Sequence, residues 1–195
     1  IENVMIPAHT TCHPKNIILL SCDAFGLMPP IAKLTETQAI FFFLNGYTSK
    51  MANTEQGITE PEITFSACFG EPFLVHHPIV YGNLLKKYLK LYNCNVWFLN
   101  TGWIKGDNKT GERISIKYSR EIINKIQDES LLNEKFTKYP YFDFLIPDNC
   151  GSIPKDILNP NMYWNYSDEY NKKLKDLHEK FQTNYKNITQ LSKIA

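Results

Sequence analysis

The chain has 195 residues, and its 43% hydrophobic and 13% aromatic content is enough to fill the core of one soluble globular domain. Lys and Arg total 21 against 20 Asp and Glu, a formal net charge of +1, so the basic excess of a nucleic-acid-binding surface is missing and no nucleic-acid partner is expected. No apolar run approaches the length that spans a bilayer, and no membrane partner is expected either.

The amino-terminal stretch IENVMIPAHT has neither the basic start nor the long apolar segment of a signal peptide. It also lacks an initiator Met, so we expect the chain to be cut from a longer polypeptide. The five cysteines are scattered without metal-knuckle spacing, which is typical of reduced thiols in a cytoplasmic protein.

Strands and helices alternate along the sequence, which predicts an α/β fold. The first apolar run, residues 16–22, fits a buried strand, and we expect Asp23 after it to form a turn rather than a metal site. Residues 47–61 are polar and predict an ordered loop, and residues 63–69 alternate like a second strand.

Two helices are predicted from clear local signals. Thr35 and Gln38 form a capping box, so a helix should run from there to about Leu44 and stop at Gly46. Apolar residues recur at helical spacing over residues 79–92, which predicts an amphipathic helix.

The middle of the chain predicts a strand at Val96–Leu99, a glycine loop and a second strand at Arg113–Lys117, followed by a helix that Ser119 caps. The loop Gly106–Gly111 begins like a phosphate-binding P-loop, but the Lys and hydroxyl residue that a P-loop requires are replaced by Glu and Arg. A solvent-facing hairpin loop is therefore the better interpretation.

The last third divides into two parts. Residues 134–166 are aromatic and punctuated by prolines, which we interpret as an irregular segment that wraps the surface. Residues 167–191 return to helical periodicity and predict a terminal helix.

Several blocks carry a resemblance to a known family: NTGW at Asn100–Trp103, RISIKYS at Arg113–Ser119, and the longer stretches at residues 21–39 and 44–73. In this order and spacing, over roughly residues 14 to 125, the chain resembles the ATP-dependent phosphoenolpyruvate carboxykinase family. The resemblance implies that residues 1–195 are part of the mononucleotide-binding carboxy-terminal domain of that fold, with a mixed sheet flanked by helices.

The family's enzymes are lyases of gluconeogenesis that decarboxylate oxaloacetate and use ATP to form phosphoenolpyruvate, CO₂ and ADP. The resemblance therefore implies ATP as cofactor, with Mg²⁺ and Mn²⁺ in the full-length enzyme. The family's phosphate loop, metal ligands and substrate-binding arginines would lie upstream of residue 1. No catalytic residue and no metal ligand is expected in this segment, and the segment alone should be inactive.

The resemblance places the adenosine end of the ATP site on Arg113, Ile114 and Ser119. A guanidinium can lie flat on a purine, and the Ile114 backbone could read the base edge. Ser119 stands where the family has Thr, which keeps the hydroxyl and loses a methyl group. From composition alone, Arg113 is equally well a surface cation on an edge strand, and Ser119 only an N-cap.

Four further residues are candidates for the wall of an adenine pocket. Phe73 stands where the family has an aromatic near the base, but it is as readily a core phenylalanine. Asn100, Thr101 and Trp103 follow a strand at its carboxyl end, where open α/β sheets bind their ligands.

Two other interpretations stay open from the sequence. One is a non-catalytic nucleotide-binding or protein-interaction module that lacks the catalytic half. The other is a thiol hydrolase with Cys68 as nucleophile and His76 or His77 as base, although Cys68 lies in an apolar stretch that favours an inert thiol. A truncated sheet would also have an unpaired edge, which predicts self-association.

Overall fold

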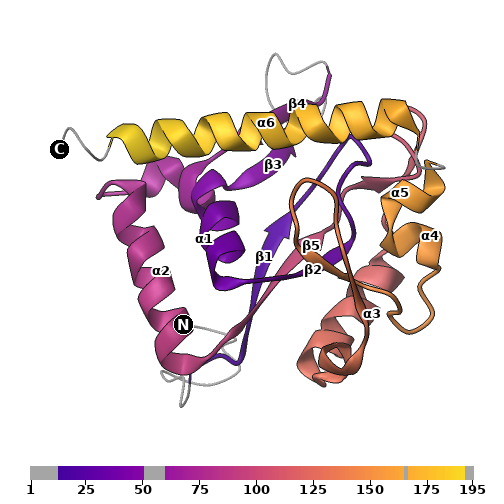
Figure 1. Cartoon of the computed structure of the whole chain (residues 1–195), viewed down its shortest axis with the longest axis horizontal. Coiled ribbons are helices and arrows are strands. Elements are labelled where there is room, and N and C mark those ends of the chain that lie inside the picture. The colour runs from indigo at the N-terminus through magenta and orange to yellow at the C-terminus, as the bar shows by residue number, and fades with distance from the viewer. Residues whose placement is uncertain (1–12, 51–59, 165–166, 192–195) are drawn as a thin grey trace, which may run out of the picture.

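The computed structural model describes residues 13–50, 60–164 and 167–191, and these form an α/β fold around a mixed sheet (Figure 1). In the main sheet the neighbours of β5 differ in direction, since β1 runs parallel to it and β2 antiparallel. The strands lie in the order β1 (Asn16–Ser21), β5 (Asn95–Asn100), β2 (Ile31–Leu34), β9 (Leu145–Pro147) and β8 (Phe136–Lys138). The predicted class, α/β with a mixed sheet flanked by helices, is confirmed.

Helices cover both faces of this sheet (Figure 1). One face packs against α1 (Glu36–Asn45), α2 (Pro78–Tyr92) and α6 (Asp168–Leu191). The other packs against α3 (Ile116–Gln127) and α4 (Lys155–Leu158), with α5 (Pro160–Tyr163) beside α4. Shorter elements complete the described chain: the strand pairs β3 (Tyr47–Lys50) with β4 (Glu62–Phe65) and β6 (Trp103–Ile104) with β7 (Glu112–Arg113), and the 3₁₀ turns η1 (Ala67–Phe69), η2 (Glu71–Phe73) and η3 (Ser130–Asn133).

The central strand β5 explains why its apolar run is continuous. Side chains alternate between the two faces of a strand, so Val96 and Phe98 enter one hydrophobic cluster whereas Trp97 and Leu99 enter the other. All four are buried because helices lie on both sides.

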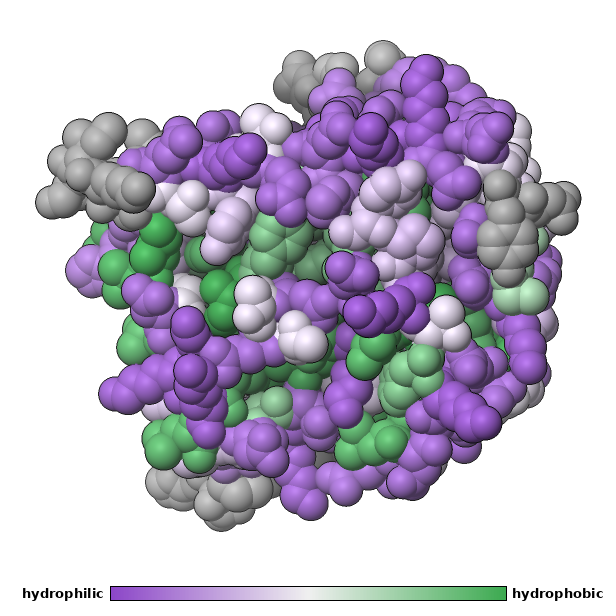
Figure 2. Space-filling model, in the orientation of Figure 1, coloured by the Kyte–Doolittle hydropathy of each residue, from purple (hydrophilic) through white to green (hydrophobic). Residues whose placement is uncertain are grey.

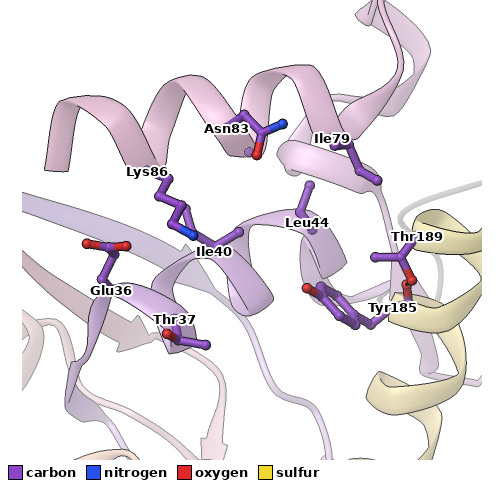
Figure 3. A pocket seen from close by; sticks show the side chains of 10 residues that line it. Glu36, Thr37, Ile40, Leu44, Ile79, Asn83, Lys86, Tyr185 and Thr189 are labelled. Carbon is purple, nitrogen blue, oxygen red and sulfur yellow. Dashed lines mark hydrogen bonds between the residues drawn. The ribbon is translucent and has the colours of Figure 1, made fainter. Parts of the chain in front are cut away.

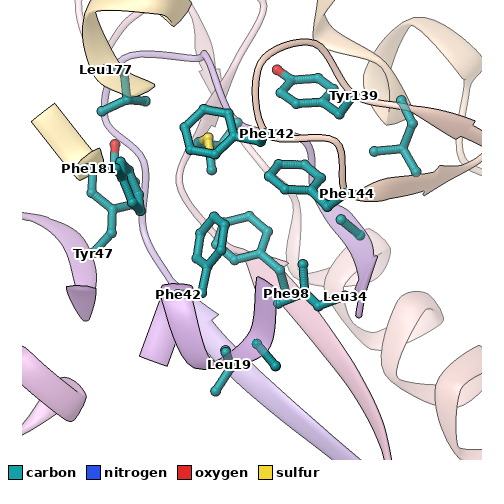
Figure 4. Packing of buried hydrophobic residues seen from close by; sticks show 14 of the residues in the cluster. Leu19, Leu34, Phe42, Tyr47, Phe98, Tyr139, Phe142, Phe144, Leu177 and Phe181 are labelled. Atoms are coloured by element: carbon teal, nitrogen blue, oxygen red, sulfur yellow. The ribbon is translucent and has the colours of Figure 1, made fainter. Parts of the chain in front are cut away.

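Aromatic rings meet in the middle of the cluster on the α1–α6 side (Figure 4). Phe42 of α1 lies at its centre, with ring centroids 5.0 Å from Phe98, 5.7 Å from Phe144 and 5.2 Å from Phe181. These rings come from α1, β5, the segment before β9, and α6, so four distant parts of the sequence meet there.

The local signals for helices hold. Thr35 caps α1, with both halves of the capping box formed, and Gly46 ends the helix in the left-handed region at φ 57°. Helix α2 begins one residue before the predicted start and ends at Tyr92 as predicted.

Three of the predicted strands and loops are wrong in extent. The strand predicted over residues 63–69 stops at Phe65, since Cys68 and Phe69 have positive φ angles of 57° and 58° inside a 3₁₀ turn. The strand predicted at Arg113–Lys117 ends at Arg113 because helix α3 already begins at Ile116. The loop predicted over residues 47–61 begins with strand β3, and its residues 51–59 lie outside the described part of the chain.

The interpretation of residues 134–166 as surface wrapping is also wrong. The segment contributes β8 and β9 to the main sheet, and its aromatic residues Tyr139, Phe142 and Phe144 are buried in the core. Its strands are three residues long and the turn at residues 139–144 separates them, so neither strand is long enough to show a period of two in the sequence. The terminal helix α6 begins one residue after its predicted start.

Helix α6 crosses the molecule along one edge and presents mainly hydrophilic residues outward (Figure 2). Within the described ranges, every helix is too short or too polar to cross a membrane.

Candidate functional site

Arg113 is held on the short hairpin that β6 and β7 form. The register places Arg113 opposite Trp103, and the guanidinium carbon lies 5.2 Å from the centre of the indole ring. The Arg113 Nε donates a hydrogen bond to the Thr101 carbonyl oxygen at 3.2 Å. One edge and one face of the guanidinium are therefore used within the hairpin, while the exposed remainder of the side chain faces solvent.

The hairpin loop is a turn built around Asp107 rather than a phosphate loop. One carboxylate oxygen of Asp107 accepts hydrogen bonds from the backbone amides of Lys109 and Thr110, each at 3.0 Å, and from the Thr110 hydroxyl at 2.9 Å. These bonds hold the pKa of Asp107 below its usual value, although its partial burial opposes them. In a P-loop the corresponding amides would point at a phosphate, so the hairpin interpretation of residues 106–111 agrees with the geometry.

Ile114 is buried, and its amide donates to the Gly102 carbonyl oxygen at 2.8 Å. That amide is therefore already bonded within the protein, and the role of the Ile114 backbone at a base edge stays a prediction. The carbonyl oxygen of Ile114 accepts no hydrogen bond from the residues that the structure describes.

Ser119 is not an N-cap. Ser115 caps α3, since its hydroxyl accepts from the Tyr118 amide at 3.2 Å. Ser119 lies one turn further on, and its hydroxyl donates to the Ser115 carbonyl oxygen at 3.4 Å. The sequence analysis placed the start of this helix four residues too late, because Ser115 was read as part of a strand.

Two of the residues predicted to line an adenine pocket, Asn100 and Thr101, use their side chains for hydrogen bonds within the protein. Asn100 is fully buried, and its side chain bonds the backbone of Asp23, Met28 and Gly102. The Thr101 hydroxyl donates to the Ser21 carbonyl oxygen at 3.2 Å. Among Asn100, Thr101 and Trp103, only Trp103 has its side chain against the exposed Arg113 guanidinium.

Phe73 is 87% exposed, so it is not a core phenylalanine. It lies in η2, between β4 and α2, and among the described residues it makes no ring contact or side-chain hydrogen bond with Arg113. The structure thus joins Arg113, Ile114, Thr101 and Trp103 through hydrogen bonds and a cation–ring contact, and Phe73 takes no part in these contacts.

The turn interpretation of Asp23 is confirmed. Its buried carboxylate accepts from the amides of Phe25, Leu27 and Met28 at 3.1, 2.7 and 2.8 Å, and from the Tyr47 hydroxyl at 2.8 Å. Burial raises the pKa of Asp23, and the four donors act in the opposite direction.

The thiol-hydrolase interpretation loses its support. Burial, with a smaller contribution from Glu71, raises the pKa of Cys68 to about 11, so little thiolate forms at neutral pH. The Sγ atom lies 3.7 Å from the Pro78 carbonyl oxygen, and the His77 Nδ1 accepts from the Ile79 amide.

No group of three or more His, Cys, Asp or Glu side chains in the described ranges is arranged to hold a metal ion. A hollow of about 190 Å³ lies between α1, α2 and α6 (Figure 3). Lys86 and Asn83 of α2 face Ile40 of α1 across it, and Tyr185 of α6 lies at its far end. None of the candidate nucleotide residues lines this hollow.

Comparison with known proteins decides the family. Residues 1–156, which include Arg113, Ile114 and Ser119, match the family model described as phosphoenolpyruvate carboxykinase, in its ATP-dependent form. The chain belongs to the ATP-dependent phosphoenolpyruvate carboxykinase family. The resemblance found in the sequence is therefore confirmed.

Several relatives in this family carry the name phosphoenolpyruvate carboxykinase (ATP). That of Caldanaerobacter subterraneus is 46% identical over 180 residues, which cover 92% of this chain and 34% of the relative. That of Emericella nidulans is 44% identical over 187 residues, 93% of this chain and 31% of the relative. That of Staphylococcus aureus is 43% identical over 185 residues, 95% of this chain and 35% of the relative. The chain thus spans about a third of the length of these carboxykinases.

Proposed function

We propose that this chain is the carboxy-terminal part of an ATP-dependent phosphoenolpyruvate carboxykinase and supplies the adenosine end of its ATP site. Residues 1–195 would be part of the mononucleotide-binding domain. The single observation that carries the proposal is the Arg113 side chain, an exposed cation held against Trp103 and the Thr101 carbonyl within a family-matched segment.

The residues around Arg113 fit an adenine nucleotide. An arginine presents a flat cation and a fork of N–H donors, which suit a purine face or a ribose and phosphate oxygens. Beside it, the Ile114 carbonyl oxygen has no hydrogen-bond donor among the described residues, and it would accept a bond from the exocyclic amine of adenine. Ser119 would add a hydroxyl only if it exchanged its bond to Ser115 for one to the ligand. These residues bind and orient the nucleotide; they move no proton.

In the complete enzyme, the reaction would be oxaloacetate and ATP to phosphoenolpyruvate, CO₂ and ADP. ATP supplies the phosphoryl group, and Mg²⁺ and Mn²⁺ supply charge neutralisation at the transferring phosphate. The residues that hold the metals and oxaloacetate would lie in the part of the enzyme that this chain does not span. The setting would be cytoplasmic gluconeogenesis.

The proposal predicts that the 195-residue chain alone does not turn over oxaloacetate. Phosphoryl transfer depends on positioning and charge stabilisation by metals and cations, and the matched third of the enzyme would hold only the adenosine end. Formation of phosphoenolpyruvate from ATP and oxaloacetate by the purified chain would contradict this division of labour.

Arg113→Ala in the complete enzyme tests the site itself. Loss of one stacked or charge-assisted contact should raise the KM for ATP by a factor that corresponds to about 1–3 kcal/mol, while the KM for oxaloacetate hardly changes. Steady-state kinetics with each substrate varied in turn would measure both.

Arg120→Ala is the matched control, because Arg120 is an exposed arginine on α3 that makes no contact with Trp103 or Thr101. It should leave the KM for ATP unchanged. An unchanged KM for ATP in a folded Arg113→Ala enzyme would make Arg113 a surface cation, and the nucleotide assignment would fall.

The chain on its own should also self-associate. Strand β1 is an edge of the main sheet, with Leu20 57% exposed, and α2 presents Val80, Leu84 and Leu91 to solvent. Unpaired edges and exposed apolar faces favour contact with another copy or with the remainder of the enzyme. A monodisperse monomer by light scattering, with little binding of a dye for apolar surfaces, would count against this prediction.

A further inference from the structure

Asn100 stands at the carboxyl end of β5 and is completely buried. Its side-chain oxygen accepts from the Asp23 amide at 2.9 Å and from the Gly102 amide at 2.8 Å, and its Nδ2 donates to the Met28 carbonyl oxygen at 3.0 Å. One amide group therefore joins the end of β5 to both ends of the turn at residues 23–28.

The turn at residues 23–28 is also held by hydrogen bonds that do not involve Asn100. The Asp23 carboxylate gathers three backbone amides of the turn, and the Leu27 carbonyl oxygen accepts from the hydroxyls of both Tyr139 and Tyr170. The two tyrosines belong to the aromatic cluster under α6. The turn is thus fixed to the core, and Asn100 is fixed to the turn.

The backbone that carries Arg113 rests on this turn. Gly102 lies so close to Asp23 that a Cβ atom on Gly102 would come within 2.0 Å of the Asp23 carbonyl oxygen. The Trp103 amide donates to that same oxygen at 2.7 Å. The Thr101 carbonyl and the Trp103 ring, which hold Arg113, therefore take their position from Asp23 and Asn100.

We infer that Asn100 is a positioning residue for nucleotide binding: through the Asp23 turn and Gly102 it fixes the seat formed by Thr101 and Trp103, on which Arg113 is held ready for the ligand. This rests on the proposed function. A long exposed arginine side chain has many rotamers, and binding must select one of them. A fixed seat lowers that entropic cost before the nucleotide arrives.

The inference changes what two of the predicted pocket residues do. Asn100 does not touch the nucleotide, because its side chain is buried and all three of its hydrogen bonds are internal. Trp103 acts through Arg113, whose guanidinium lies over its ring. A purely structural Asn100 would instead stabilise the fold and have no specific link to Arg113.

A double-mutant cycle in the complete enzyme separates these two roles. Asn100→Ser, Trp103→Leu and Arg113→Ala are compared singly and in pairs with Arg113→Ala, by the KM for ATP, by the KM for oxaloacetate and by direct titration with ADP. Residues that act through one group show non-additive effects, whereas independent residues add.

We expect Asn100→Ser and Trp103→Leu each to raise the KM for ATP and the Kd for ADP about five- to tenfold, with kcat and the KM for oxaloacetate within twofold of the wild type. In the Arg113→Ala background, either substitution should add less than a twofold further increase. Trp103 is only half-buried, so Trp103→Leu tests the seat even if Asn100→Ser does not fold.

Two results would overturn the inference. One is the same five- to tenfold loss in the Arg113→Ala background, which would show that the seat acts independently of Arg113. The other is an equal rise in the KM for oxaloacetate, which would show a general disturbance of the fold. An Arg113→Ala enzyme with unchanged ATP affinity is a different failure, since it would remove the proposed function and leave the seat only structural.

Discussion

The two faces of the main sheet differ in how far their parts lie from one another in the sequence. On the α1–α6 face, the Phe42 ring meets Phe98, Phe144 and Phe181, so the core closes only when the carboxy-terminal helix has docked. On the α3 face, the hydrophobic cluster comes mostly from the continuous stretch 97–158, and Ile31 of β2 is the exception. The candidate nucleotide site belongs to this second, more local part of the molecule.

The candidate nucleotide site depends on both faces of the sheet. Arg113 stands on the local side, yet its seat rests on the turn at residues 23–28, which the tyrosine hydroxyls of the aromatic face hold. A change in the aromatic core should therefore reduce the stability of the whole chain, whereas a change at the start of α3 should have a limited effect.

The largest expected effect follows from Phe42→Ala. Phe42 is 1% exposed at the centre of the aromatic cluster, and removal of a buried phenylalanine typically costs about 3–5 kcal/mol. Urea unfolding followed by circular dichroism would measure the loss. Phe73→Ala is the matched control, because Phe73 is 87% exposed and its removal should leave the unfolding midpoint nearly unchanged.

A small effect of Phe42→Ala would contradict the proposed difference between the two faces, since it would mean that the aromatic face is not the main source of stability. A large effect of Phe73→Ala would show instead that this exposed ring is covered by another copy of the chain.

The sequence alone predicts the local parts of this arrangement and misses the distant ones. The strand at residues 96–99, the capping box at Thr35 and the amphipathic spacing of α2 each depend on neighbouring residues, and each prediction holds. The strand β2 is four residues long and follows two prolines, so neither its length nor its pattern distinguishes it from a turn.

The same division applies to the candidate site. Arg113 and its neighbours were found through the family's motif, whereas the role of Asn100 depends on a bond to Asp23, 77 residues away. Positive φ angles of 61° at Tyr141 and 56° at Asp143 make the turn that buries Phe142, and no glycine marks that turn in the sequence. Tertiary packing determines such features, and local propensity does not report it.

An intermediate effect is expected at the start of α3. Ser115→Ala should cost about 1 kcal/mol because it removes the N-cap hydroxyl that accepts from the Tyr118 amide. Ser119→Ala should change stability very little, because its hydroxyl only donates back to the Ser115 carbonyl oxygen. Urea unfolding of both variants would measure how much one local hydrogen bond on the α3 face contributes to the free energy of unfolding.

Ser119 also has a separate test in the complete enzyme. If its hydroxyl contacts ATP, Ser119→Ala should raise the KM for ATP modestly and Ser119→Thr should be neutral. Equal ATP affinity in all three proteins would remove Ser119 from the site and leave Arg113 and Ile114. A stability loss from Ser119→Ala as large as that from Ser115→Ala would contradict the observed start of the helix.

The smallest expected effect is a pH dependence at the edge of the aromatic face. The His178 ring packs edge-on against Phe142 with centroids 5.0 Å apart, and burial lowers the pKa of His178, against the opposing influence of Glu179 and Asp143. The unfolded chain therefore binds this proton more readily than the folded chain. The stabilising contribution is fully present above the unfolded pKa of about 6.5 and is lost as the pH falls through the lower folded value.

Urea midpoints at pH 7.5 and pH 5.5 would measure this loss, and His178→Gln should reduce the difference between them. The change should be small, because solvent still reaches part of the ring.

His76→Gln is a matched control on the exposed segment before α2, and it should leave the difference as it is in the wild type. If the pH dependence survived His178→Gln unchanged, the loss of stability at low pH would have to come from another group whose pKa is lower in the folded chain. A raised pKa at Asp23 acts with the opposite sign, since protonation at low pH would then favour the folded chain. The direction of the pH effect therefore distinguishes the edge of the aromatic face from the turn that supports Arg113.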